Sequence, residues 1–100
     1  MSLRCPIPTK MREELGADPF MRTCLLKDET CGGRLEWQHS FQYASKRQNE
    51  LYFILPLCSS HHRRQAKYRR EQEDAVRMRI KHFHATESFK EKYPRSNLLP

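Results

Sequence analysis

The residues that could carry out chemistry in this chain lie between Cys24 and His62. Three cysteines and three histidines fall in this stretch, and most of them form two groups separated by apolar segments. The first group is Cys24-x6-Cys31, and the second is Leu57-Cys58-Ser59-Ser60-His61-His62. Thiolate and imidazole are typical zinc ligands. We therefore expect one metal ion to hold this stretch together, while the remaining histidines are available for catalysis.

The composition favours metal binding over disulfide bonds for these cysteines. The chain has 100 residues, 31% of them charged, and a mean hydropathy of −0.93, so its core is thin and needs a covalent or metal staple. Residues 1–10 lack the apolar segment of a secretory signal, which predicts a reducing cytoplasmic location. The longest apolar run, 51–58, is too short to span a membrane. Cys5 is expected to be a free thiol.

Two segments have the pattern of β-strands. From Arg34 to Phe41, apolar and polar side chains alternate, and His39 falls on the apolar side. A lone histidine in that position is by default a buried core residue. The second segment, 51–57, is aromatic and aliphatic throughout, as in a strand that is buried on both faces. The polar residues 42–50 between them predict a loop, with one helical turn at 44–48.

Helices are expected on both sides of these strands. Residues 10–15 form a short helical pattern that ends at Gly16, and Asp18-Pro19 marks a turn or a helix start. A helix over 61–70, capped by Ser59 or Ser60, follows the second strand. A second or continuing helix over 71–82 has an apolar face made by Val76, Ile80 and Phe83. The capping box Ser88-x-x-Glu91 predicts a last short helix.

A dense basic run follows the second ligand group, in a chain whose net charge is +7. The run contains Arg63, Arg64, Lys67, Arg69 and Arg70. Clustered cations are the electrostatic footprint of a nucleic-acid partner, although a solvated helix face has the same composition. The neighbouring histidines favour nucleic acid. On one continuous helix, Arg63, Lys67 and Arg70 would share a face.

The order of these features resembles the HNH, or ββα-metal, nuclease superfamily, and in particular small HNH proteins of phages and prophages. Three segments carry the resemblance over roughly 40 residues: Gly33-Arg34-Leu35-Glu36-Trp37-Gln38-His39, Tyr43-Ala44-Ser45-Lys46-Arg47-Gln48, and Ile54-Leu55-Pro56-Leu57-Cys58-Ser59-Ser60-His61-His62-Arg63. The resemblance implies an α+β fold with a zinc-stapled ββα-metal core at 24–70. An N-terminal arm at 1–23 and a C-terminal helical extension at 71–100 would flank this core.

The resemblance also implies roles for single residues. A structural zinc would be bound by a Cys3His set, which is Cys24, Cys31, Cys58 and His61. His39 corresponds to the general base, and His62 to a ligand of a catalytic Mg²⁺ or Mn²⁺ ion. Gln38 stands where the family has an acidic or histidine ligand of that ion. Asn49 or Gln48 is the nearest substitute for the asparagine that orients the base.

The expected function is that of a metal-dependent DNA endonuclease that hydrolyses phosphodiester bonds and nicks one strand. The setting would be the cytoplasm of a bacterial or phage-infected cell, and a homodimer would allow both strands to be cut. Two other functions remain open. One is a catalytically weak, zinc-stabilised DNA-binding module, and the other is a zinc-stapled protein-interaction domain that regulates another enzyme.

Overall fold

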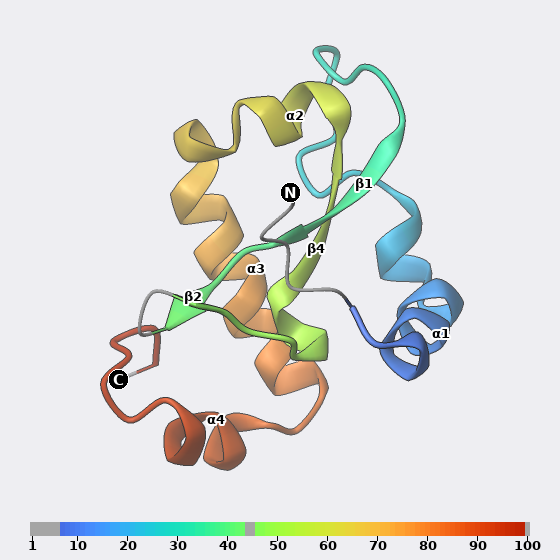
Figure 1. Ribbon diagram of the computed structural model, residues 1–100. Helices are drawn as coiled ribbons and strands as arrows, with labels where there is room; N and C mark the ends of the chain where they lie inside the picture. Colours follow the sequence, from blue (N-terminus) through green and yellow to red (C-terminus); the bar gives the residue numbers. More distant parts are fainter. Residues whose placement is uncertain (1–6, 44–45, 100) are drawn as a thin grey trace.

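A two-stranded antiparallel ribbon runs through the middle of the molecule (Figure 1). The computed structural model describes residues 7–43 and 46–99, and in it β1 (Leu35–His39) pairs with β4 (Ile54–Cys58). Leu35 lies opposite Cys58 and His39 lies opposite Ile54, so His39 and Cys58 mark opposite ends of the ribbon. Both predicted strands are therefore present. The second one is shorter than expected, because Leu51–Phe53 form the 3₁₀-helix η2.

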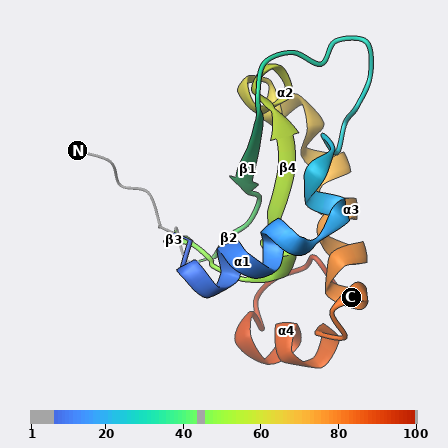
Figure 2. The ribbon, with the colours of Figure 1, turned by 90° about the vertical axis from the view of Figure 1, so that its right-hand side faces the viewer.

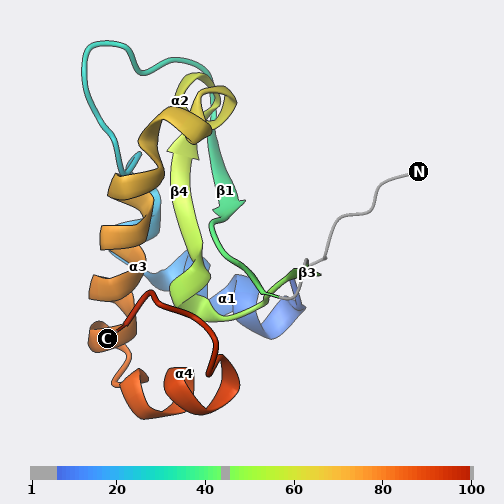
Figure 3. The same ribbon diagram turned by 90° about the vertical axis from the view of Figure 1, so that its left-hand side faces the viewer.

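Helices pack against both faces of this ribbon, which confirms a small α+β fold. In Figures 2 and 3, α3 (Arg69–His82) runs alongside β4, and α1 (Thr9–Ala17) lies near the other end of the ribbon from α2 (Ser59–Arg63). Successive strand residues point to opposite faces. Leu55 accordingly packs with α3 in one core cluster, while Ile54 packs with Leu15 of α1 in the other.

The larger core cluster joins η2 and β4 to α3 and α4 (Thr86–Lys92). Phe53 is fully buried at its centre, and Phe41 stacks on it with 4.4 Å between ring centroids. Val76 and Ile80 are buried on α3, and Phe83 packs against the cluster, as the apolar periodicity predicted. In the described ranges, no helix has both the length and the apolar character needed to cross a membrane.

The N-terminal residues that were expected to form an arm pack onto the ribbon from residue 7 onward. Helix α1 continues past Gly16 to Ala17, where the Asp18 backbone N–H bonds the Leu15 carbonyl. Asp18 then accepts a hydrogen bond from the Phe20 N–H at 3.0 Å and caps η1 (Pro19–Arg22), so the predicted helix start is confirmed. Cys5 lies outside the described residues.

The expected helix over 61–70 is wrong, because the chain breaks into α2 and the 3₁₀-helix η3 (Gln65–Tyr68). The break is at Arg64, which has φ −105° and ψ 19°. The side-chain amide of Gln72 donates to the carbonyls of Gln65 and Tyr68, at 2.8 and 3.3 Å. These two hydrogen bonds satisfy carbonyl groups just before α3, and they stabilise the 3₁₀ turn of η3.

Two other local predictions are wrong. Instead of a helical turn, β2 (Gln42–Tyr43) pairs with β3 (Lys46–Arg47) in a hairpin, and residues 44–45 lie outside the described ranges. Helix α4 begins at Thr86, so Ser88 lies inside it and is not its cap. His84, with φ +52°, reverses the chain, and the Ala85 N–H bonds the Ile80 carbonyl. Helix α4 therefore starts earlier.

One buried ion pair joins α3 to the N-terminal segment. The Arg79 guanidinium donates to Asp18 at 2.5 Å, and these side chains are 6% and 19% exposed. The guanidinium also lies between the rings of Phe20 and Phe83, at 4.1 and 4.8 Å from their centroids. Burial opposes ionisation of Asp18, but hydrogen bonds from Arg79 and the Phe20 backbone hold the pKa of this carboxyl below its ordinary value.

Removing the carboxylate should leave a buried cation without its partner. We expect Asp18→Ala to lower the free energy of unfolding by about 3–5 kcal/mol, measured by urea denaturation at fixed zinc concentration. The pair's contribution should be present at neutral pH and should disappear as the pH falls from 3.8, the ordinary pKa of aspartate, towards the lowered one.

The matched control for this change is Asp74→Ala, which removes the exposed Asp74–Arg77 pair at 2.9 Å. It should cost less than about 1 kcal/mol. Equal destabilisation by the two substitutions would mean that burial of Arg79 has no energetic consequence.

Candidate metal centre and adjoining histidines

Four potential metal ligands come together at the end of the ribbon where β4 meets α2. Cys58 is the last residue of β4, and His61 lies in the first turn of α2. Cys24 and Cys31 flank the loop that follows η1. The ligand atoms of these four side chains all lie within 4.8 Å of one another. The structure thus gathers the cysteines and the histidine that the sequence assigned to a structural zinc.

Turn chemistry brings the cysteine loop against α2. Asp28 accepts a hydrogen bond from the Thr30 N–H at 2.8 Å, and the Cys31 N–H bonds the Asp28 carbonyl. The Ser60 N–H then bonds the Gly32 carbonyl at 3.1 Å. Gly33 has φ +78°, and a Cβ there would lie 2.7 Å from the Ser59 side chain. Only glycine fits at this crossing without strain.

The distances from His61 to the three sulfurs are close to those expected around a tetrahedral ion. The Nδ1 atom of His61 lies 3.6, 3.5 and 3.1 Å from the sulfurs of Cys24, Cys31 and Cys58. Typical zinc–sulfur and zinc–nitrogen bonds in a tetrahedron separate a sulfur from a nitrogen by about 3.6 Å. A Cys3His set is also an accepted structural zinc set. The cluster is therefore compatible with a structural metal such as zinc.

The Cys58 thiol has a pKa that favours metal binding. Burial opposes its ionisation, but hydrogen bonds from the backbone of His61 and Gly32 and from the His61 ring lower the pKa of this thiol to about 6. Burial raises the pKa of the Cys24 thiol. Because zinc binds thiolate sulfur, the lowered pKa of Cys58 favours the metal and the raised pKa of Cys24 opposes it.

The outer nitrogen of the His61 ring has partners of its own. Its Nε2 lies 3.2 Å from the Thr30 hydroxyl and 3.4 Å from an Asp28 carboxylate oxygen. Thr30 in turn donates to Asp28 at 2.6 Å, and Arg64 donates to Thr30 at 3.1 Å. A histidine ligand typically donates its second ring N–H to such a group, which fixes the ring orientation.

His62 lies next to the metal cluster but bonds a different residue. Its Nδ1 is 2.6 Å from the Oε1 of Glu36 on β1, and Ser59 donates to the other carboxylate oxygen at 3.2 Å. The hydrogen bond from His62 lowers the pKa of Glu36. With Nδ1 used in this way, Nε2 of the half-buried His62 ring is the atom left for a ligand.

His39 lies at the other end of β1 and contacts Asn49. The His39 Nε2 and the Asn49 Oδ1 are 2.8 Å apart. An amide oxygen is an acceptor only, so the proton of a neutral His39 is on Nε2, and no described residue bonds its Nδ1, which is an acceptor. The structure thus joins two of the residues to which the sequence gave catalytic roles.

Gln38 does not lie beside His62, where the sequence placed it as a ligand of a catalytic ion. It is 8% exposed, and its Nε2 donates to the Oε1 of Gln72 on α3 at 3.3 Å. The physical reason lies in the ribbon register, because residue 36 pairs with Leu57 next to α2, while residue 38 pairs with Leu55 farther along. Glu36 therefore takes the place beside His62.

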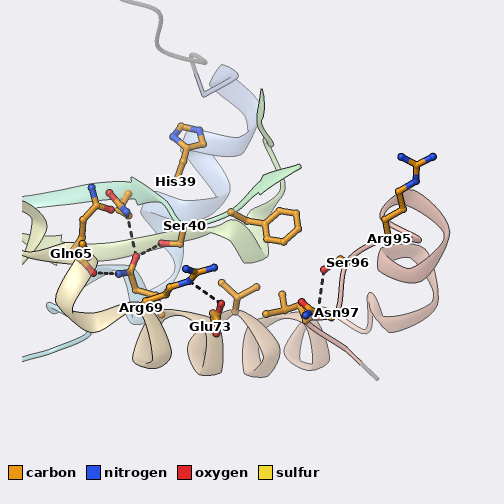
Figure 4. Close-up of a pocket in the computed structure, with 14 residues that line it drawn as sticks. His39, Ser40, Gln65, Arg69, Glu73, Arg95, Ser96 and Asn97 are labelled. Atoms are coloured by element: carbon orange, nitrogen blue, oxygen red, sulfur yellow. Dashed lines mark hydrogen bonds and ion pairs between the residues drawn. The ribbon is translucent and has the colours of Figure 1, made fainter. Parts of the chain in front are cut away.

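His39 and His62 do not face one another. Glu36, the partner of His62, precedes His39 by three residues, which is about 10 Å along an extended strand. Odd and even residues of β1 also point to opposite faces of the ribbon. In Figure 4, His39 projects from the side of β1 opposite to Arg69 and Glu73 of α3. The two histidines thus belong to separate places on the surface.

The basic run is split by the break between α2 and α3. Arg64 is bound to Ser60 and Thr30 and supports the cysteine loop. Arg69 forms an exposed ion pair with Glu73 at 3.4 Å. Arg63, Lys67 and Arg70 are exposed, and within the described part of the chain they form no ion pair. These three remain the best candidates for phosphate contacts, although they are not on one helix.

Comparisons with known proteins assign no function to this site. No known protein family matches the chain, and no curated protein or solved structure is significantly similar to it. The likeness to HNH proteins therefore rests on the three sequence segments alone. Any function has to be argued from the contacts among the side chains.

Sequence reasoning missed Glu36, Asp28 and Thr30 as parts of the site. The alternation of residues 34–41 placed Glu36 on the polar face of β1, but only the strand register brings it to His62. Asp28 and Thr30 lie between two of the cysteines, and nothing in the sequence marks them as partners of His61. Their approach to the His61 ring depends on the folded cysteine loop.

The residues behind His61 should tune metal affinity without being ligands themselves. We expect the double variant Asp28→Ala and Thr30→Val to bind zinc about 10–100-fold more weakly, because the His61 ring loses the partners that orient it. Competition with a chromogenic zinc chelator measures this change. Glu29→Ala, an exposed residue between the two, is the matched control and should retain wild-type affinity. Identical affinities for all three proteins would show that the contacts to Nε2 are incidental.

Proposed function

We propose that this protein is a metal-dependent DNA endonuclease of the HNH type. The observation that carries the proposal is the 2.8 Å contact between His39 and Asn49, at the end of a ribbon whose other end carries the Cys3His cluster. In the family that the sequence resembles, an asparagine orients the histidine that acts as the general base. The folded chain supplies this pair despite the unusual spacing of Asn49 in the sequence.

His39 would act as the base for hydrolysis. Its Nε2–H donates to Asn49, which leaves the Nδ1 lone pair free to accept a proton from a water molecule. General base catalysis of this kind contributes typically 10²–10⁴-fold to a rate. Asn49 is a positioning residue in this scheme, because it selects the tautomer of His39 and does not contact the reacting water.

A catalytic divalent ion would be held by the Nε2 of His62, whose ring Glu36 orients through the hydrogen bond at Nδ1. An imidazole nitrogen suits Mn²⁺, which commonly completes its coordination with water and substrate phosphate. Such an ion stabilises the charge that develops on the phosphate and the leaving oxygen. Gln38 contributes no ligand in this scheme, because it lies farther along the ribbon than Glu36, opposite Leu55. The neighbouring cysteine cluster cannot serve, because four protein ligands leave no open position on its metal.

DNA would be bound through its phosphates by the exposed cations next to His62. Arg63 follows His62 directly, and Lys67 and Arg70 continue along η3 and the start of α3. Such contacts are independent of base sequence and provide most of the affinity in non-specific binding. The net charge of +7 favours the same partner.

A second candidate function is DNA binding without cleavage. The separation of His39 from the Glu36–His62 pair favours it, because a base and an ion that act on one phosphate must both lie within contact distance of it. Cleavage through both groups requires a conformation in which His39 and His62 approach the same phosphate. A binding module has no such requirement.

Loss of the proposed base should abolish cleavage while leaving binding intact. We expect His39→Ala to reduce the rate of plasmid nicking, measured with millimolar Mn²⁺, by at least about 100-fold, and Asn49→Ala by a smaller factor. His84→Ala, an exposed histidine after α3, is the control and should cut at the wild-type rate. Nicking by His39→Ala at the wild-type rate would contradict the catalytic assignment. If the wild type binds DNA but does not nick it with any divalent ion, the binding module is the function.

The exposed cations should set the salt dependence of DNA binding. We expect the triple variant Arg63→Gln, Lys67→Gln and Arg70→Gln to weaken binding to unrelated duplexes alike. The slope of log K against log salt should flatten by roughly 0.9 for each phosphate that the variant no longer neutralises. Lys10→Gln, Lys81→Gln and Lys90→Gln remove equal charge from other exposed positions and form the control. Equal slopes for the two triple variants would argue against this surface as the DNA interface.

A further inference from the structure

A cleft that none of these roles uses lies between the end of β1, the first half of α3 and the C-terminal segment 95–98 (Figure 4). Its volume is about 960 Å³, within the range of sites that hold small ligands. The C-terminal wall is fixed in place, since the Arg77 Nε donates to the Leu98 carbonyl at 2.7 Å and Leu98 is buried. The C-terminal segment is therefore anchored to α3, and the cleft is a fixed feature of the fold.

The floor of this cleft is a network of amides and a hydroxyl. The Gln72 Oε1 accepts hydrogen bonds from the Gln38 Nε2 at 3.3 Å and from the Ser40 hydroxyl at 3.0 Å. The Gln72 Nε2 donates to two backbone carbonyls, so this amide is saturated. Gln38 is not saturated, because among the described residues its Oε1 bonds no group and its Nε2 donates only once.

The side-chain amide of Gln38 borders the cleft and still has hydrogen-bonding capacity, with an acceptor and a donor side by side. This pair of groups matches the edge of a nucleobase, which glutamine binds through two parallel hydrogen bonds. The apolar side chains of Val76 and Leu98 line the same space and suit the faces of a ring. The chemistry of the floor and walls is thus that of a site for a flat, polar-edged molecule.

Two arginines border the cleft and could bind phosphate. The side chain of Arg69 is 84% exposed and pairs only loosely with Glu73 at 3.4 Å, and Arg95 lies on the C-terminal wall. The exposed Arg70 follows Arg69 directly in α3. A ligand with a neutral base and an anionic backbone would contact the floor and the rim together.

We propose that this cleft binds one unpaired nucleotide of single-stranded DNA, with its base against Gln38 and its phosphate near Arg69. The inference rests on the proposed function in taking DNA as the partner, and it specifies a single-stranded or flipped-out nucleotide. Gln38 is only 8% exposed at the floor of the cleft, so a base stacked inside a duplex cannot reach it, whereas a base that has left the stack can. His39 also lines the edge of the cleft, but its side chain projects from the opposite side of β1, so this nucleotide would be bound and not cleaved at the floor.

Fluorescence anisotropy with a labelled single-stranded 12-mer and with the duplex of the same sequence tests this site. Gln38→Met keeps the volume but removes the amide, and Arg95→Gln removes a rim cation outside the basic run. Both should weaken single-strand binding, Gln38→Met by about 5–100-fold, while duplex affinity stays at the wild-type value. Ser40→Ala should also weaken single-strand binding, but by less than Gln38→Met. Its control is Ser88→Ala on α4.

Each outcome decides the proposal. Equal weakening of single-strand and duplex binding, or no weakening of either, overturns it. If Gln38→Met is not folded, as judged by circular dichroism, Arg95→Gln decides alone, because Arg95 is an exposed residue. A wild-type protein that binds and nicks duplex DNA but shows no dependence on Gln38 or Arg95 refutes the cleft and leaves the proposed function standing. A wild-type protein that binds neither form of DNA refutes both.

Discussion

The convergence of three sulfurs and one imidazole nitrogen on a single point is the constraint on which the rest of the structure depends. It joins the loop after η1, the end of β4 and the start of α2, which are far apart in the sequence. A structural zinc in such a set contributes on the order of 10–16 kcal/mol at neutral pH, as much as or more than the whole stability of a typical domain. In a chain of 100 residues with a thin core, this contribution would decide whether the ribbon and α2 form at all.

The strand register at the Cys3His cluster also determines which groups the polar side chains of β1 contact. Because Cys58 pairs with Leu35, Glu36 is held beside α2 and meets His62 at 2.6 Å. Farther along the ribbon, Gln38 meets Gln72, and the last residue, His39, meets Asn49. The strand thus carries three separate polar contacts in sequence. The sites proposed for the ion, the nucleotide and the general base would accordingly lie one after another along this ribbon.

Local patterns in the sequence predicted the elements, and tertiary contacts decided the details. Alternation gave β1, and the apolar spacing of Val76 and Ile80 gave α3. The four candidate metal ligands could be named from the resemblance to HNH proteins, since the spacing Cys-x6-Cys is a weak signal by itself. The break at Arg64 could not be predicted, since it depends on the Gln72 side chain from the next helix. Glu36 was missed and Gln38 misplaced for a related reason. The alternation of polar and apolar residues shows which face of a strand a residue lies on, but it does not show which residue of the neighbouring strand lies opposite.

The dependence of the fold on a bound metal is tested most directly by a metal inventory of the purified protein, combined with circular dichroism before and after chelation. Native mass spectrometry should show one zinc ion per chain. Removing the zinc with a strong chelator should abolish the folded signal, and adding one equivalent back should restore it. A metal-free protein that keeps its folded spectrum, or a linked pair among Cys24, Cys31 and Cys58 in place of a bound ion, would contradict this dependence.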